Sequence, residues 1–245
     1  MILAENNLYE FLKIHTHEFH PVVKFNSDTD TLSAFDFTEN NHEFKKIDRQ
    51  NTQTFSKYIF DKLKMQGAKF GYGGYDELRA LYNESDLFNQ DLNNNNFSVT
   101  PEEPRRLHIG IDIWGKAGTE IFAPTDGHVH SFAFNDHFGD YGATIILFHQ
   151  SEGISFHTLY GHVSLEDIKN LREGEFISRG KNFASFGKPA ENGHWPPHLH
   201  FQIIKDILPY KGDYPGVCKL SERIKYLENC PDPEVILNMA RFKNV

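Results

Sequence analysis

The sequence is poor in cysteine, with two such residues in 245. Cys218 and Cys230 lie in a segment that shows no other sign of a disulfide framework, so free thiols in a reducing compartment are the preferred interpretation. A chain of this length can bury a sizeable core without covalent cross-links. Disulfides are therefore not needed to explain how the chain folds.

Positive charge and long apolar runs are also scarce. The chain has 25 Lys and Arg against 34 Asp and Glu, for a formal net charge of -9. Proteins that follow a phosphate backbone usually carry a basic surface, so we expect no nucleic acid partner. There is no apolar run of about 18 residues and no signal-peptide pattern in residues 1–20. This predicts no membrane partner and a cytoplasmic location, or a periplasmic or secreted one if an export signal has been removed.

Aromatic residues are abundant, with 22 Phe and 10 Tyr, and the first part of the chain has helical periodicity. A second, short helix is expected from about Asp76 to Asn83. The polar tract Asn93 to Asn96 marks the expected boundary with the next region. The clearest helix is predicted before Gly67, from apolar side chains at helical spacing at Phe55, Tyr58, Ile59 and Leu63.

From about Leu107 the pattern changes to short apolar runs separated by turn residues, which is typical of an antiparallel sheet protein. We therefore predict a mainly β domain, sandwich-like or barrel-like, over residues 101–210. A helical N-terminal region, residues 1–100, is expected to pack on this domain or to cover it. A helical C-terminal extension, residues 211–245, is expected to follow.

Two histidines share one face of a predicted strand in the stretch "HLHFQII". Residues two apart on a strand point to the same side, about 6.6 Å apart. His198 and His200 therefore look into one space, while Leu199 and Phe201 point to the other. Burying an unpaired imidazole costs on the order of 1 to 3 kcal/mol. A bound cation would compensate this cost; a pair of hydrogen-bonded strand histidines is the alternative.

Further metal ligands are available in the stretch "HIGID", where His108 and Asp112 are four positions apart. On a straight strand such positions are separated by about 13 Å, beyond the reach of both side chains to one ion. We therefore predict that the strand bends, with Gly110 as the place of least steric cost. Two His and one Asp are ligands that zinc accepts, and they leave a fourth position for water, as in catalytic sites.

These stretches carry a resemblance to the lysostaphin and LytM-type zinc metallopeptidases, which cleave peptide cross-bridges and stems of bacterial cell walls. The likeness extends from about Arg106 to Lys205 and is specific, because separated motifs occur in the family's order. The sequence looks closest to a subgroup found without export signals. The motifs are "HIGID", "IFAPTDGHV", "YGATIILFH", "LYGH", "LREGEFISRG" and "PPHLHF".

The resemblance implies one Zn2+ per chain, bound by His108, Asp112 and His200. It also implies that His162 and His198 are catalytic histidines outside the metal's ligand set, on the family's duplicated hybrid motif β fold. The implied activity is that of a zinc metallopeptidase, which hydrolyses a peptide bond in a peptidoglycan-like or short peptide substrate with a metal-activated water. Another divalent ion that accepts His and Asp is the open alternative. Because ligand histidines must be neutral, activity is expected to fall in acid.

Several further residues near these motifs are candidates for substrate contact. The resemblance places Tyr141 in a loop that lines the cleft of related enzymes, while His194 and Trp195 adjoin the site in sequence. The histidines of "GHVHS", His128 and His130, have the same spacing as the site pair but fall in a predicted hairpin. We interpret them as surface residues.

Two functions of different classes fit this resemblance. The first is an active zinc peptidase, and the second is a catalytically silent binding or regulatory module that keeps the peptidase fold. All five implied site positions hold the required residue types, which favours the enzyme. A subsidiary hypothesis is that the segment Asn93 to Phe97 covers the groove and supplies a fourth metal ligand.

Overall fold

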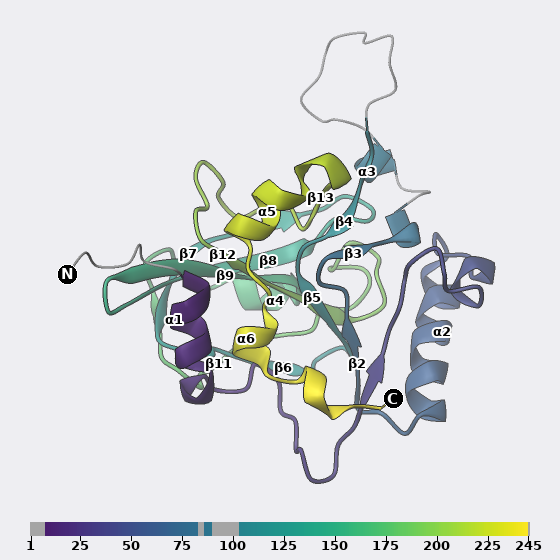
Figure 1. The fold of residues 1–245 in the computed structure, drawn as a ribbon, viewed down its shortest axis with the longest axis horizontal. Helices are drawn as coiled ribbons and strands as arrows, with labels where there is room; N and C mark the ends of the chain where they lie inside the picture. Colours follow the sequence, from purple (N-terminus) through teal and green to yellow (C-terminus); the bar gives the residue numbers. More distant parts are fainter. Residues whose placement is uncertain (1–7, 83–85, 90–102, 245) are drawn as a thin grey trace, which may run out of the picture.

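The structure, a computed structural model, describes residues 8–82, 86–89 and 103–244 and is built around a nine-stranded sheet (Figure 1). The polar tract at Asn93 to Phe97 lies outside the described residues. From one edge to the other, the sheet contains β10 (Phe176–Ile177), β7 (Gly127–Asn135), β8 (Gly142–Ser151), β9 (Ile154–Val163), β12 (His198–Ile204), β5 (Ile111–Trp114), β2 (Phe70–Gly73), β1 (Leu32–Ala34) and β14 (Lys243–Asn244).

Two smaller sheets and several short helices complete the described part of the chain. One sheet pairs β11 (Asn182–Ser185) with β6 (Glu120–Phe122), and the other has the order β13 (Val217–Lys219), β4 (Arg105–His108), β3 (Glu77–Leu78). The α-helices are α1 (Leu8–Ile14), α2 (Thr52–Met65), α3 (Asp86–Asn89), α4 (Leu165–Ile168), α5 (Arg223–Asn229) and α6 (Glu234–Leu237). The 3-10 helices are η1 (Thr16–Glu18), η2 (Phe44–Lys46), η3 (Ala80–Tyr82), η4 (Leu220–Glu222) and η5 (Ala240–Phe242).

The mainly β, antiparallel prediction is confirmed, with one addition at the edge of the large sheet. Strands from β10 to β2 pair antiparallel, whereas β1 pairs parallel with both β2 and β14. Parallel neighbours need a long crossover, usually a helix. Here α2 lies between β1 and β2 in the chain and supplies it. The N-terminal region therefore contributes strands as well as helices, and the predicted domain limits at 100 and 210 stay a prediction.

The helix predicted before Gly67 is confirmed as α2. Its four predicted apolar residues are buried, the Asn51 side chain accepts hydrogen bonds from the Gln53 and Thr54 amides at its start, and Gly67 follows its end with φ +60°. Such a cap satisfies amides that the first turn leaves unpaired. The apolar face that the sequence pattern predicts for α2 is therefore the face that is buried in the structure.

The short helix predicted from Asp76 to Asn83 is wrong at its start, and of its described residues only Ala80–Tyr82 are helical, in a 3-10 helix. Asp76 has φ +54°, outside the helical region, and the next residues form β3 and then η3. Leu78 pairs with Leu107 of β4, and the Arg79 amide donates to the Arg106 carbonyl over 2.9 Å. Pairing with a distant strand thus overrides the local helical preference.

A cluster of aromatic side chains joins α2 to the large sheet. Trp114 of β5 lies at its centre, with ring centroids 5.5 Å from Phe37 and 5.8 Å from Phe55. On its other side Trp114 stacks on His198 at 3.8 Å with an interplanar angle of 14°. The N-terminal region therefore packs against the part of the sheet that carries the candidate site residues.

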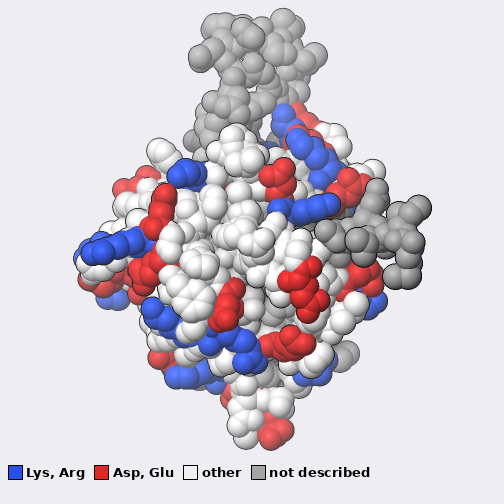
Figure 2. Space-filling model, turned by 90° about the vertical axis from the view of Figure 1, so that its left-hand side faces the viewer, with Lys and Arg blue, Asp and Glu red and all other residues white. Residues whose placement is uncertain are grey.

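The molecular surface has no uniform charge on the face drawn in Figure 2. Acidic and basic side chains alternate across that face, with apolar and neutral polar groups between them. Within the described ranges, no helix has both the length and the apolar character needed to cross a membrane.

Candidate metal centre

The predicted bend between His108 and Asp112 is present. His108 ends β4 in the three-stranded sheet, and Asp112 lies in β5 of the nine-stranded sheet, so the chain changes sheets at Ile109 and Gly110. A Cβ on Gly110 would lie 2.5 Å from the His200 ring, so this close approach requires glycine. The bend brings His108 Nε2 to 3.4 Å from Asp112 Oδ1.

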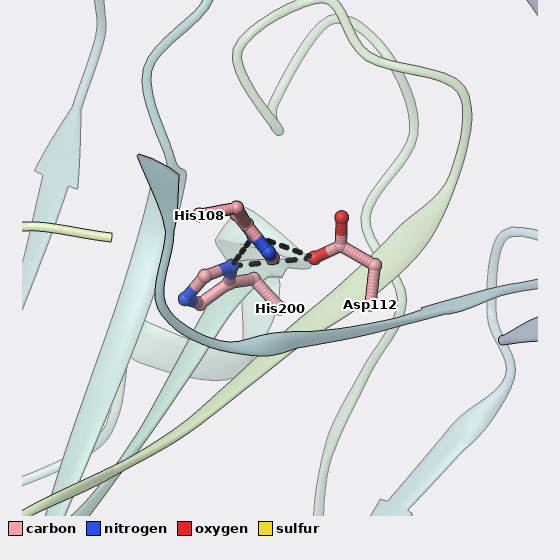
Figure 3. A group of neighbouring side chains, drawn as sticks. All are labelled: His108, Asp112 and His200. Carbon is pink, nitrogen blue, oxygen red and sulfur yellow. Dashed lines mark hydrogen bonds and ion pairs between the residues drawn. The ribbon is translucent and has the colours of Figure 1, made fainter. Parts of the chain in front are cut away.

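The neighbouring strand β12 adds the third side chain of the group. His200 is opposite Asp112 in the antiparallel register of β12 and β5. His200 Nδ1 lies 2.9 Å from His108 Nε2 and 3.2 Å from Asp112 Oδ1, and all three residues are almost fully buried (Figure 3). The structure thus brings His108, Asp112 and His200 together as a potential metal site.

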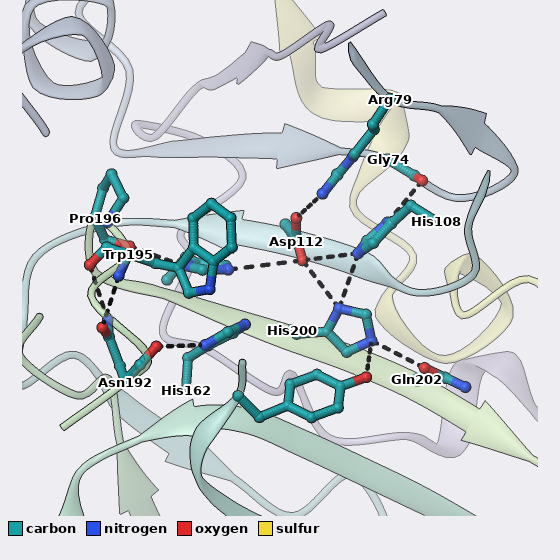
Figure 4. Close-up of polar contacts among 12 residues, drawn as sticks. Gly74, Arg79, His108, Asp112, His162, Asn192, Trp195, Pro196, His200 and Gln202 are labelled. Carbon is teal, nitrogen blue, oxygen red and sulfur yellow. Dashed lines mark hydrogen bonds and ion pairs between the residues drawn. The ribbon is translucent and has the colours of Figure 1, made fainter. Parts of the chain in front are cut away.

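The outer contacts of the two histidines determine which ring nitrogen of each carries the proton and which carries the lone pair. His108 Nδ1 is 2.8 Å from the Gly74 carbonyl oxygen, and His200 Nε2 is 2.9 Å from Gln202 Oε1 (Figure 4). The Gln202 amide is oriented by its Nε2, which donates to the Pro215 carbonyl over 3.2 Å. Both outer histidine nitrogens are then N–H donors, so in the neutral form of each ring the facing nitrogen carries the lone pair.

With these tautomers, three electron-pair donors converge on one point. Asp112 Oδ1 is buried and, among the described residues, accepts no hydrogen bond of good geometry. Two ligand atoms of one tetrahedral zinc ion lie about 3.3 Å apart, given bonds of about 2.0 Å. The observed sides of 2.9, 3.2 and 3.4 Å are close to that value. The donor set fits a single zinc ion, and a cation would relieve the repulsion between the lone pairs.

The second oxygen of Asp112 binds an arginine from the N-terminal region. Arg79 Nη1 donates to Asp112 Oδ2 over 2.6 Å. Burial alone would raise the pKa of Asp112, but the positive charge of the adjoining Arg79 guanidinium outweighs burial and holds that pKa well below its ordinary value. Burial, with the positive charge of Arg79, lowers the pKa of His108 to about 3. An ionised Asp112 beside a neutral His108 is the state that binds metal.

The two predicted catalytic histidines lie beside this group. His162 and His198 have ring centroids 4.1 Å apart, and His198 Nε2 is 4.0 Å from Asp112 Oδ1. Their Nδ1 atoms are 2.9 Å from the Asn192 carbonyl and 2.8 Å from the Pro196 carbonyl, respectively. These contacts make Nδ1 the protonated nitrogen in each ring and leave a lone pair on Nε2.

Both of these histidines are neutral near pH 7. Burial is the main cause and lowers the pKa of His198 to about 4. Burial and the neighbouring His198 and His200 rings lower the pKa of His162 well below its ordinary value. His162 also has φ +64°, a conformation that non-glycine residues seldom adopt and that is enriched at functional sites.

A cavity of about 420 Å³ opens onto the site and includes two of the three predicted substrate-contact residues. Tyr141 lines it, with Oη 3.3 Å from His200 Nε2, and Trp195 lines it with its indole N–H bonded to the Asp140 carbonyl. His194 is not part of the lining; its ring stacks on Phe138 at 5.4 Å. Segments before β4 and after β12 contribute to the wall, through Leu81, Tyr82, Leu87, Phe88, Tyr210, Tyr214 and Tyr226.

Residues 106–212 match the model of peptidase family M23. These residues, which we call the M23 segment, are similar to that family. The resemblance inferred from the motifs is thereby confirmed for these residues, which include all five predicted metal and catalytic positions. M23 is a metallopeptidase family, and His108, Asp112 and His200 form a buried group that could hold a metal ion.

Individual relatives match part of the chain. An uncharacterized metalloprotease of Haemophilus influenzae is 31% identical over 98 residues, which are 40% of this chain and 18% of that protein. This chain therefore covers less than a fifth of that relative. A zinc-containing peptidase from Vibrio cholerae is 25% identical with a TM-score of 0.32, over 40% of this chain and 27% of that one. The catalytic domain of lysostaphin from Staphylococcus simulans is 19% identical with a TM-score of 0.34, over 49% of this chain and 80% of that one.

Some site residues were missed by the sequence analysis. Gln202 follows His200 by two positions, so strand alternation alone could have indicated that it shares the face of the metal group. Trp114 has the same relation to Asp112. Arg79 and Gly74 lie more than thirty positions before Asp112, and nothing in the M23 motifs refers to them.

The remaining polar candidates lie away from the metal group. His128 and His130 are on β7, where His128 is exposed and His130 is half-buried, and neither belongs to the potential metal site. Their placement agrees with the interpretation as residues near the surface. Cys218 and Cys230 are both buried and free.

Proposed function

We propose that this chain is a zinc-dependent metallopeptidase that hydrolyses a peptide bond. The observation that carries the proposal is the convergence of three unprotonated donor atoms, from His108, Asp112 and His200, next to a cavity and two neutral histidines. The M23 match over residues 106–212 supports the same chemistry. One zinc ion per chain would be held by Nε2 of His108, Nδ1 of His200 and Oδ1 of Asp112.

The metal and the uncoordinated histidines would have separate tasks. A bound zinc ion supplies Lewis-acid activation of a water molecule and of the scissile carbonyl. The chain's own groups must then move protons. The Nε2 atoms of His162 and His198 carry lone pairs, because each Nδ1–H donates to a backbone carbonyl. Either ring can therefore take a proton from the attacking water.

The same histidine can complete the reaction. After it accepts a proton at Nε2, the ring holds an N–H that can be passed to the nitrogen of the leaving amine. Its other nitrogen stays bonded to the backbone carbonyl, which keeps the ring in place during both transfers. His198 is also fixed by stacking on Trp114. Such positioning leaves little reorganisation for the reaction step.

The cavity favours a short stretch of peptide as the substrate. Its volume of about 420 Å³ lies in the range of sites for small ligands. Aromatic side chains from segments before β4 and after β12 surround it, and Tyr141 and Trp195 offer contact surfaces beside the metal group. A short peptide or a peptidoglycan-like peptide stem is the substrate class that we propose.

The test is the zinc content of the purified chain, followed by hydrolysis of a set of short peptides. We expect about one zinc ion in the parent protein and little in the His108→Ala and His200→Ala variants. His130→Ala is the matched control, since this half-buried histidine lies outside the metal group. A parent that takes up no zinc would refute the proposal. Zinc binding without hydrolysis of any peptide would instead favour the catalytically silent binding module.

A further inference from the structure

The M23 segment does not contain all the contacts of its own metal group. Two of the three candidate ligands are bonded to the loop and strand that lead from β2 to η3, well before residue 106. The Gly74 carbonyl accepts from His108 Nδ1, and Arg79 Nη1 donates to Asp112 Oδ2 (Figure 4). The N-terminal region therefore contacts the site through specific polar bonds as well as through packing.

Arg79 is held rigidly where it meets Asp112. Its side chain is 2% exposed, and its Nε donates to Glu77 Oε2 over 2.7 Å. Nη1 lies 3.1 Å from the Tyr82 hydroxyl, and the guanidinium lies over the Phe37 ring at 5.3 Å. A buried guanidinium fixed on several sides in this way can hold a carboxylate in one orientation.

The backbone at Gly74 is shaped to admit this arginine. Gly74 has φ +109°, and a Cβ there would lie 1.9 Å from Arg79 Nη2 and 3.0 Å from His108 Nδ1. Any larger residue would push the guanidinium or the imidazole away. The same glycine thus allows the Arg79 contact and supplies the carbonyl for His108.

The hydrogen bond from Arg79 determines whether Asp112 can bind an ion through one carboxylate oxygen or through both. With Oδ2 engaged by Nη1, only Oδ1 faces the two histidines. A carboxylate released from this bond could turn and bind through both oxygens, which would raise the coordination number. Outer contacts of this kind orient ligands and change metal affinity in other proteins.

We propose that Arg79 is a positioning residue of the metal centre, which holds Asp112 as a one-oxygen ligand from a part of the chain outside the M23 segment. The inference rests on the proposed zinc site. It predicts that Arg79 sets both the affinity for the metal and the geometry around it.

The test compares Arg79→Gln with the parent protein and with Arg223→Gln. Arg223 also binds an aspartate, Asp76, but on the surface, which makes it a matched control. Zinc affinity is measured by competition with a chelator, and the visible spectrum is recorded after loading with Co2+. Tetrahedral Co2+ absorbs more strongly than octahedral Co2+, because a tetrahedral site has no inversion centre, and five-coordinate Co2+ is intermediate.

In Arg79→Gln we expect zinc affinity to fall by about 10- to 100-fold and the Co2+ bands to weaken. Arg79→Lys keeps the charge and should recover part of the affinity, whereas Arg223→Gln should match the parent. Parental affinity and spectrum in folded Arg79→Gln would overturn the inference. If Arg79→Gln does not fold, Glu77→Gln is tested in its place, because it removes the ion pair that fixes the Arg79 guanidinium. We expect a smaller fall in zinc affinity and a smaller weakening of the Co2+ bands. Parental zinc affinity and a parental Co2+ spectrum in this variant would overturn the inference.

These outcomes separate the inference from the proposed function. A parent protein that binds neither zinc nor Co2+ refutes the metal site itself. A parent that binds both ions, together with an unaffected folded variant, refutes only the role of Arg79.

Discussion

His108 Nε2 and His200 Nδ1 lie 2.9 Å apart, and the opposite nitrogen of each ring already donates to an oxygen. Two facing lone pairs at this separation repel each other unless a positive charge lies between them. A cation bound between the two rings removes this repulsion and so stabilises the folded arrangement. Metal binding and folding should therefore be coupled.

This coupling predicts that zinc raises the melting temperature of the protein. A ligand that binds only the folded state at 100 times its Kd adds about 2.7 kcal/mol to the free energy of unfolding. Thermal unfolding followed by circular dichroism, with zinc and with a chelator, measures the shift. His108→Ala should show no shift. A parent protein with the same melting temperature in both solutions would contradict the coupling.

The metal-free protein should lose stability between about pH 6.5 and pH 4. Burial lowers the pKa of both His149 and His198 to about 4, from a value near 6.5 in the unfolded chain. Within this range the unfolded chain binds protons that the folded chain does not, so the free energy of unfolding falls as the pH falls. Each histidine contributes up to about 3 kcal/mol. Urea unfolding at several pH values measures the slope.

His149 offers a control for this pH dependence that lies away from the metal group. Its two nitrogens contact the Asp126 carbonyl and the Thr158 hydroxyl. In His149→Gln the free energy of unfolding should change less steeply with pH than in the parent, whatever its absolute value. An equal slope in the two proteins would mean that His149 does not titrate as its burial predicts.

Replacing His198 should separate turnover from metal binding. His198 Nε2 is 4.0 Å from Asp112 Oδ1, beyond the group that could hold the ion. We expect His198→Gln to keep its zinc while the rate of peptide hydrolysis drops by about 10²- to 10⁴-fold, the usual effect of losing a proton-transfer group. Zinc content and turnover are measured on the same sample. Loss of zinc in this variant would mean that His198 is a ligand.

Gln202 should control zinc affinity through His200. Its Oε1 accepts from His200 Nε2 and so keeps the lone pair on Nδ1. Gln202→Leu removes the acceptor, and we expect zinc affinity to fall by about 10- to 100-fold. Gln202→Glu keeps an acceptor and should retain most of the affinity. Equal zinc affinity in the leucine variant and the parent would show that the tautomer of His200 does not depend on Gln202.

Gly110→Ala should disturb both stability and the metal site. The new Cβ would lie 2.5 Å from the His200 ring and 3.0 Å from the Phe201 carbonyl oxygen. Overpacking of this kind costs about 1 to 3 kcal/mol of unfolding free energy. Gly153→Ala is the control, since Gly153 has φ +81° but no atom within 4 Å of an added Cβ. It should lose stability through its backbone alone and keep full zinc uptake, whereas Gly110→Ala should lose zinc.

The order of the strands, and the strands that the N-terminal region adds to the sheets, could not be predicted from the sequence pattern. The stretches that became β9 and β12 are short apolar runs bounded by turn residues, so their existence was predictable. The helix expected from Asp76 was wrong because its residues pair with β4, more than 25 positions later in the chain. Similarly, β1 and β2 are short and carry no strong alternation, and only their place beside β5 makes them strands.

The sequence by itself determined the chemical types available to the site. Histidines two apart on a strand share a face, and the five-residue spacing of "HIGID" with its central glycine predicts a bend, because both follow from local backbone geometry. Only the tertiary structure decided which atoms meet. The facing nitrogens of His108 and His200 depend on acceptors held by distant backbone, and the orientation of Asp112 depends on Arg79. Hydrogen-bond partners far apart in the chain leave no local signal in the sequence, so only the folded structure shows which groups pair.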